Sequence, residues 1–262
     1  MEYFATEIEK KKRAELLKLM QQWKRVIKKK GKIVFPDDGK AYDAIDYFNV
    51  DGFFPGYFKR GRQRVLFIGR EARYNSGCDR IKNDLRWFKT VKINAISFWR
   101  RILYIVYGIR TNGKYTYYEI PYANEILEEM QKKNDYGFAL MNISKYSNDA
   151  DDGANANYSL INQFLKDSEL SKRNFIREEI SILDPDIIIT ANLWKGGIEW
   201  DELEKIIPEK DCKFIKEIKN VATLWDFSFN GKIIKLVDLQ HFSCRGSDDA
   251  LFYTPTMKLL FK

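Results

Sequence analysis

The fold is decided by the stretch Arg64-Val65-Leu66-Phe67-Ile68-Gly69-Arg70-Glu71-Ala72-Arg73-Tyr74. An apolar run ends at a glycine, and a group of ionisable side chains follows at once. This pattern is typical of a buried parallel strand whose carboxyl end carries a functional loop. We therefore expect the first core strand of an α/β domain here, followed by its active-site loop.

Three later apolar runs have the same character and lie at 137–142, 186–190 and 233–239. Helical patterns separate them, and strands that alternate with helices predict a three-layer α/β/α sandwich with a central, mostly parallel four-stranded sheet. Right-handed crossovers place the carboxyl ends of such strands at one edge. Glu71 and Asn142 should therefore lie near His241, the one histidine of the chain.

The first sixty residues have a different composition from the rest. Residues 6–30 show a helical pattern with an apolar stripe, and Gly31 is placed to end it. We expect residues 1–58 to form a basic helix and an aromatic-rich loop that pack on an α/β domain at 59–262. Further helices are expected at 81–107, 123–132, 160–167, 173–183 and 200–207, with edge strands around the turn Asn230-Gly231.

The net charge of +8 is compatible with a polyanionic partner such as DNA. Residues 1–32 hold eleven Lys or Arg against four Glu, which is nearly the whole excess. The simpler interpretation is a surface helix whose lysines are merely solvated.

Charged residues interrupt every apolar run before the run reaches the length of a bilayer span, so we expect no membrane segment. A monomeric, cytoplasmic protein is expected, associated with the nucleoid if the source is bacterial.

The cysteines give no sign of a metal centre or a disulfide framework. Cys78, Cys212 and Cys244 are widely spaced, and a single histidine cannot supply a site that needs two imidazoles. We expect no cofactor, no metal and no iron–sulfur cluster. A Mg²⁺ ion held by carboxylates is the open alternative, although Asp151-Asp152 and Asp248-Asp249 are better explained as solvated loops.

The strand ends resemble, in order, the motifs of the uracil-DNA glycosylase superfamily. The resemblance covers residues 65–245 and is carried by Gly69-Arg70-Glu71-Ala72-Arg73, Leu140-Met141-Asn142-Ile143-Ser144-Lys145, Leu183-Asp184-Pro185 before an aliphatic strand, and His241-Phe242-Ser243. Two prolines of the superfamily pattern are replaced, by Ala72 and Phe242. The sequence therefore resembles a remote or diverged member.

The resemblance implies a role for each matching residue. Catalysis would fall to Glu71, which orients water or stabilises the sugar cation, and to His241, which donates to the departing base. The base would be bound by Gly69, Arg70, Asn142 and Tyr74, and the DNA backbone by Arg73, Ser144, Lys145, Ser243 and Arg245. Each has a structural alternative: His241 as a packed residue, Asn142 as a turn cap, and Glu71 as the partner of Arg70, Arg73 or Arg80.

The resemblance thus predicts a cofactor-free DNA glycosylase that cleaves the N-glycosidic bond of a flipped uracil or other deaminated base. One alternative is a catalytically altered or inactive member that binds nucleic acid or a protein. Another is a small-molecule α/β hydrolase or nucleotide-binding enzyme, which the lack of glycine-rich phosphate-binding and Gly-x-Ser-x-Gly motifs disfavours.

Overall fold

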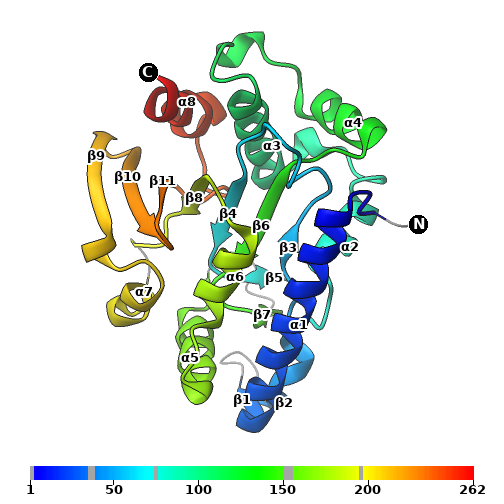
Figure 1. Ribbon diagram of the computed structural model, residues 1–262, viewed down its shortest axis with the longest axis vertical. Coiled ribbons are helices and arrows are strands. Elements are labelled where there is room, and N and C mark those ends of the chain that lie inside the picture. The colour runs from blue at the N-terminus through cyan, green and yellow to red at the C-terminus, as the bar shows by residue number, and fades with distance from the viewer. Residues whose placement is uncertain (1–2, 35–38, 74–75, 150–155, 195–196) are drawn as a thin grey trace.

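The computed structural model describes residues 3–34, 39–73, 76–149, 156–194 and 197–262. Over these ranges the chain forms an α/β domain around one mixed seven-stranded sheet (Figure 1). In spatial order the strands are β3 (Gly52–Phe53), β6 (Phe138–Asn142), β4 (Val65–Gly69), β8 (Ile187–Ala191), β11 (Lys232–Leu239), β10 (Ala222–Phe229) and β9 (Cys212–Ile218).

The four strands expected from the sequence are neighbours and run parallel, in the order β6-β4-β8-β11. The expectation of a four-stranded sheet was wrong in extent, because antiparallel β3 extends one edge and β10 and β9 extend the other. The β10–β11 hairpin turns at Asn230 and Gly231, whose φ angles of 50° and 75° suit a tight two-residue turn. Two small sheets also form, β1 (Lys32–Val34) with β2 (Ala41–Asp43) and β5 (Ala72–Arg73) with β7 (Ser147–Asn148).

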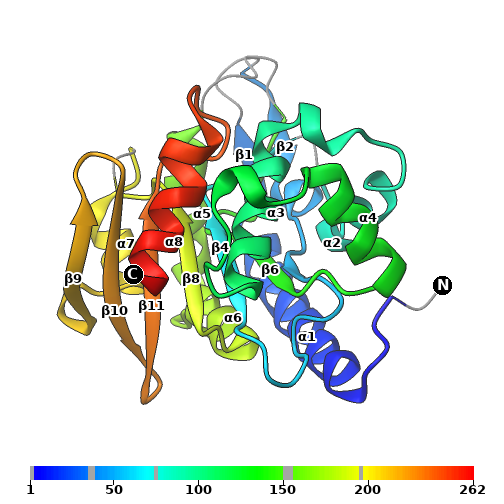
Figure 2. The ribbon, with the colours of Figure 1, turned by 90° about the horizontal axis from the view of Figure 1, so that it is seen from above.

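Helices cover both faces of the sheet. The α-helices are α1 (Glu7–Lys30), α2 (Arg80–Trp87), α3 (Ser97–Arg110), α4 (Ala123–Lys133), α5 (Tyr158–Ser168), α6 (Phe175–Leu183), α7 (Trp200–Ile206) and α8 (Thr254–Phe261). Figure 2 shows α1 and α6 on one side of the sheet and α3, α4 and α8 on the other. Short 3-10 helices are η1 (Ala44–Tyr47), η2 (Ile93–Ala95), η3 (Tyr117–Glu119), η4 (Glu169–Ser171) and η5 (Glu209–Asp211), and η6 (Asp249–Tyr253) is a π-helical turn before α8.

Helix α1 is tied closely to the rest of the domain. Thr6 caps its first turn by accepting the N–H of Glu9, and Gly31 ends it at a φ of 83°. Its apolar stripe is buried. The centre of the Trp23 ring lies 5.3 Å from the ring centre of Phe164 in α5 and 5.2 Å from that of Phe175 in α6. Because β3 joins the main sheet, the first 58 residues contribute to the same core as the strands that follow.

Two helical predictions need correction. The long helix expected at 81–107 is divided into α2 and α3, because Asn94 leaves the helical path and exchanges two 3.1 Å backbone-to-side-chain hydrogen bonds with Asn124 of α4. Helix α8 is an addition, because no helix was expected after residue 207. Proline stands in the first turn of α8, where a missing N–H costs nothing.

Candidate functional site

The carboxyl ends of β4, β6, β8 and β11 lie at one edge of the sheet, and the sequence motifs follow three of them. The loops after β4 and β6 are joined by the short β5–β7 ladder, which lies beyond the ends of both strands in Figure 1. Two backbone hydrogen bonds reinforce this link, from Ile143 to the Gly69 carbonyl at 3.0 Å and from Ser144 to the Arg70 carbonyl at 2.9 Å. The two loops are therefore linked to each other through their backbones.

Glu71 is held between these loops. Its Oε1 atom accepts hydrogen bonds from Nδ2 of Asn148 at 3.1 Å and from the backbone N–H of Asn157 at 3.0 Å. Burial raises the pKa of Glu71 above its ordinary value, and the two hydrogen bonds together with the charges of Arg73 and Arg70 oppose that shift. Within the described part of the chain, its buried Oε2 atom has no hydrogen-bond partner. Arg80, one partner considered from the sequence, instead lies 3.5 Å from Asp84.

Asn142 is the last residue of β6 and is paired in register with Gly69 at the end of β4. Its side chain is buried, and its Oδ1 atom occupies the space where a side chain on Gly69 would begin. The Nδ2 atom is buried and donates to no acceptor among the residues that the structure describes. An unpaired amide donor is costly inside a protein, so this carboxamide is suited to a ligand that offers an acceptor.

The backbone of Asn142 is fixed by a buried ionic cluster of Asp51, Lys145 and Glu179. Its N–H donates to Oδ2 of Asp51 at 2.7 Å, and its carbonyl accepts from Nζ of Lys145 at 2.8 Å. The Lys145 ammonium pairs in turn with Asp51 at 2.8 Å and Glu179 at 2.7 Å. Burial alone would lower the pKa of Lys145, but the charges of Asp51 and Glu179 have the larger effect. The pKa of Lys145 is therefore raised, and the lysine is charged.

The prediction that Ser144 and Lys145 contact the DNA backbone was wrong. Both side chains have 0% exposure. Lys145 is occupied by the buried cluster, and the Ser144 hydroxyl accepts the N–H of Tyr146 at 3.2 Å. The polar run after β6 has the character of a surface loop in the sequence, but its carboxylate partners come from segments far away along the chain.

His241 follows β11 and is only partly exposed. Its Nδ1 atom accepts the backbone N–H of Ser243 at 3.3 Å. Burial, together with the nearby charges of Arg70 and Arg101, lowers the pKa of His241 to about 4. The imidazole is therefore neutral at pH 7, and with Nδ1 as acceptor its proton is on Nε2, which is left as a hydrogen-bond donor.

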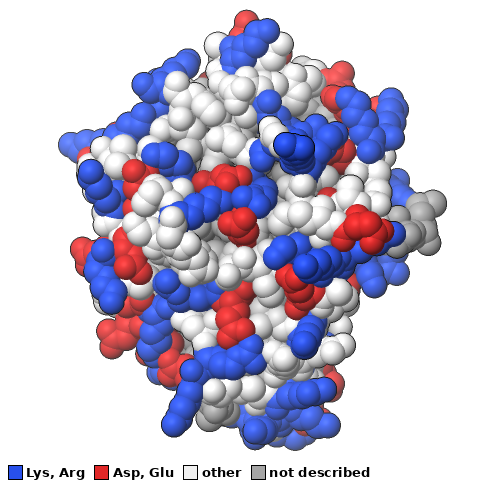
Figure 3. Space-filling view, viewed as in Figure 1, with Lys and Arg blue, Asp and Glu red and all other residues white. Residues whose placement is uncertain are grey.

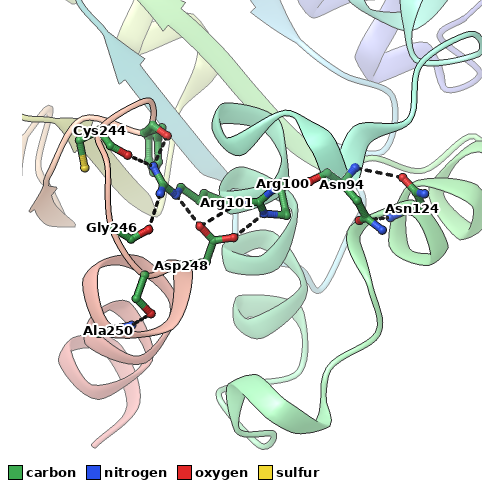
Figure 4. A network of polar contacts seen from close by, with 10 residues as sticks. Asn94, Arg100, Arg101, Asn124, Cys244, Gly246, Asp248 and Ala250 are labelled. Carbon is green, nitrogen blue, oxygen red and sulfur yellow. Dashed lines mark hydrogen bonds and ion pairs between the residues drawn. The ribbon is translucent and has the colours of Figure 1, made fainter.

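Arg101 of α3 shapes the loop that carries His241. Its guanidinium donates to the carbonyls of Phe242 at 2.5 Å, Cys244 at 2.8 Å and Gly246 at 2.9 Å, and to Oδ1 of Asp248 at 2.7 Å. Figure 4 shows Arg101 reaching from α3 into the loop, with Arg100 beside it on the same Asp248 carboxylate. The expectation of a solvated Asp248 was wrong, because this carboxylate is buried between two guanidinium groups.

Arg70 connects the parts of the site. It follows Gly69 directly, its charge acts on the pKa of Glu71, and the same charge acts on His241. Its guanidinium lies 5.6 Å from the centre of the Tyr158 ring and donates to the Tyr158 hydroxyl at the start of α5. The structure thus packs Asn142 against Gly69, two residues before Glu71, and the charge of Arg70 acts on both Glu71 and His241.

The remaining predicted residues differ in exposure. Ser243 and Arg245 are exposed on the His241 loop, and Arg73 is half-buried in β5. Tyr74 lies outside the described residues, as do Asp151 and Asp152.

Figure 3 shows Lys and Arg spread over one face of the molecule, with a group at its lower end where α1 and the β1–β2 hairpin lie. Lys28, Lys29, Lys30 and Lys32 are exposed in this region.

Three hollows of about 270, 280 and 230 Å³ lie elsewhere on the protein. None of them is lined by Glu71, Asn142 or His241.

Among the described residues, no group of three or more His, Cys, Asp or Glu is arranged to hold a metal ion. In the same ranges, no helix combines the length and apolar character needed to cross a bilayer.

Comparison of the chain with protein-family models, with curated proteins and with solved structures finds no match.

Four residues of the site were not predicted from the sequence, namely Arg101, Asp51, Asn148 and Tyr158. Arg101 stands in an aromatic helical run with no local motif, and Asp51 precedes the first motif by eighteen residues. Only the tertiary structure brings these residues to the motif loops.

Proposed function

We propose that this chain is a uracil-DNA glycosylase-like protein that binds DNA and hydrolyses the N-glycosidic bond of a flipped uracil or other deaminated base. The observation that carries the proposal is the neutral His241 imidazole, with its proton on Nε2 and the charge of Arg70 acting on it. Negative charge develops on the base as the bond breaks. A preorganised donor in a partly dry site stabilises such a charge, and losing one typically slows a reaction by about two to three orders of magnitude.

Arg70 adds to this effect. Its charge adds to burial in lowering the pKa of His241, and it offers a fixed positive charge to the same departing anion. A neutral donor backed by a cation is suited to stabilising a leaving group without giving up a proton. The base would therefore leave as an anion, with His241 as hydrogen-bond donor rather than general acid.

Asn142 and Glu71 supply the two other groups that the reaction needs. The unpaired Nδ2 of Asn142 is a donor for a base carbonyl, and its backbone is fixed on both sides by Asp51 and Lys145. The unpaired Oε2 of Glu71 is an acceptor for the attacking water, and its charge favours the sugar cation. Exposed Ser243 and Arg245 would contact phosphates flanking the flipped nucleotide.

One observation favours a second candidate, a member of the fold that binds nucleic acid or a protein without cleavage. Two hydrogen bonds already occupy Oε1 of Glu71, and such bonds are typical of a carboxylate that holds two loops together. Under this candidate the exposed lysines of α1 and the Arg245 loop would still bind DNA, with an affinity that falls steeply as salt rises.

The deciding experiment uses labelled oligonucleotides that contain one uracil, hypoxanthine or xanthine, in single- and double-stranded form. Excess protein is incubated with each, and alkali then cleaves any abasic site. The proposal predicts cleavage that His241→Gln and Asn142→Ala reduce by about 100-fold or more, with Gln240→Ala as the matched control on the same loop. Salt-sensitive binding with no abasic site on any substrate would favour the binding protein instead.

A further inference from the structure

One of the three hollows, apart from the glycosylase-like site, is lined by indole rings. It has a volume of about 230 Å³ and lies between α7 and the face of β9, β10 and β11. Three of the six tryptophans of the chain line it, namely Trp194, Trp200 and Trp225. Ile207 and Leu236 give its floor an apolar character, since both are buried.

The charged groups among the described residues that line this hollow are all acidic. Glu204, Glu209 and Asp238 line it, and none of its described lining residues is Lys or Arg, although the chain has 45 of these. Burial raises the pKa of the lining Cys212 thiol to about 11, and the neighbouring carboxylates, Glu204 and Glu209 among them, raise it in the same direction. The described charges that line this hollow are therefore all negative, in a protein whose net charge is positive.

Several contacts fix these side chains in place. The Glu204 carboxylate accepts the backbone N–H of Glu209 at 3.1 Å, and Asp238 accepts the Thr190 hydroxyl at 2.6 Å. The Trp225 ring packs on Phe214 at 5.1 Å between ring centres. Trp225, Glu204 and Asp238 are thus held in position without a ligand.

We propose that this hollow binds a small organic cation, such as a quaternary ammonium compound. Indole faces attract cations, and carboxylates at the rim add to that attraction while they repel phosphates and nucleic acid. Pockets for drug-sized ligands have volumes of about 300–1,000 Å³, so a hollow of about 230 Å³ admits only a small molecule. The site does not depend on the glycosylase-like site, because none of the residues proposed for base excision lines it.

The test compares choline with its neutral isostere, 3,3-dimethylbutan-1-ol. Each has one methyl resonance, whose line broadening is followed by NMR as the full chain is titrated in. We expect saturable choline binding, with the isostere at least about tenfold weaker because it lacks the charge. Absence of saturable choline binding, or equal affinity for the two compounds, would overturn the proposal.

Two variants locate the binding. Trp200 is 51% exposed, so Trp200→Ala leaves the core intact and is expected to weaken choline binding by about fivefold or more. Glu204→Gln removes one rim charge and should weaken choline but not the neutral isostere. The matched control is Trp87→Phe, because Trp87 is a 38% exposed indole on α2, away from this hollow. Choline affinity unchanged by Trp200→Ala would contradict the location.

Discussion

Gly69 and Asn142 are matched at the ends of neighbouring strands: a Cβ atom on Gly69 would lie 2.5 Å from Oδ1 of Asn142. Real Cβ atoms do not approach an oxygen so closely, so the carboxamide occupies this place only because residue 69 has no side chain. The glycine that ends the first strand is therefore explained by packing against Asn142. The relationship links two motifs that are more than seventy residues apart in the sequence.

Gly69→Ala is expected to displace the Asn142 side chain. A misplacement of about 1 Å at a reacting group can cost about 100-fold in rate, while the added methyl group should cost about 1–3 kcal/mol of stability. Single-turnover base release, measured well below the midpoint of thermal unfolding, separates the two effects. An unchanged rate in the folded variant would show that Asn142 does not position the base.

Lys145→Met should destabilise the chain strongly. The substitution leaves Asp51 and Glu179 buried without their cation, and breaking a buried ion pair in this way typically costs about 3–5 kcal/mol. Urea denaturation gives the free energy of unfolding, and the double variant Lys145→Met with Glu179→Gln should recover part of the loss. A loss below about 1 kcal/mol would mean that the cluster is not formed.

Arg101→Lys should loosen the His241 loop. Lysine keeps the charge but cannot donate to three carbonyls and Asp248 together, and each hydrogen bond lost by a charged group costs about 1.5–3 kcal/mol. Hydrogen exchange of residues 242–248 should become faster. Arg100→Lys is the control, since Arg100 binds Asp248 but none of these carbonyls. Equal exchange in both variants would contradict this role for Arg101.

The pH dependence of stability should carry the signature of His241. Its pKa falls from 6.5 to about 4 in the folded chain, so between these values the unfolded chain binds the extra proton. Stability should fall as pH drops through that window, by about 3 kcal/mol at most, at about 1.36 kcal/mol per pKa unit. Urea denaturation between pH 7 and pH 4 should show a smaller fall for His241→Gln than for the parent chain. Parallel curves would contradict a depressed pKa.

The four core strands could be predicted because local sequence determines them. Runs such as Val65–Ile68 and Ile187–Ile189 are apolar at every position, which indicates strands covered on both faces, and the structure has strands there. The end of α1 at Gly31 was predicted for a similar local reason. Edge strands gave weaker signals, since residues 212–218 alternate charged with apolar residues and are exposed along much of their length.

The surroundings of the site could not be predicted in the same way. Lys145 looks like a surface lysine in the sequence, because nothing near it shows that Asp51 and Glu179 meet it inside the core. Asp248 was misjudged for the same reason, as its partners Arg100 and Arg101 stand nearly 150 residues earlier. Hydrophobic periodicity predicts which face of a helix or strand is buried. It does not predict which charged residue from a distant segment packs against that face.

The most direct test of the site is an NMR titration of the one histidine in the chain. Its single imidazole signal reports His241 alone, in the parent chain, in Arg70→Gln and in the control Gln240→Ala. We expect a pKa of about 4 in the parent and the control, and a higher pKa in Arg70→Gln because a neighbouring positive charge is lost. A pKa near 6.5 that Arg70→Gln leaves unchanged would show that His241 does not share a site with the Gly69–Glu71 loop.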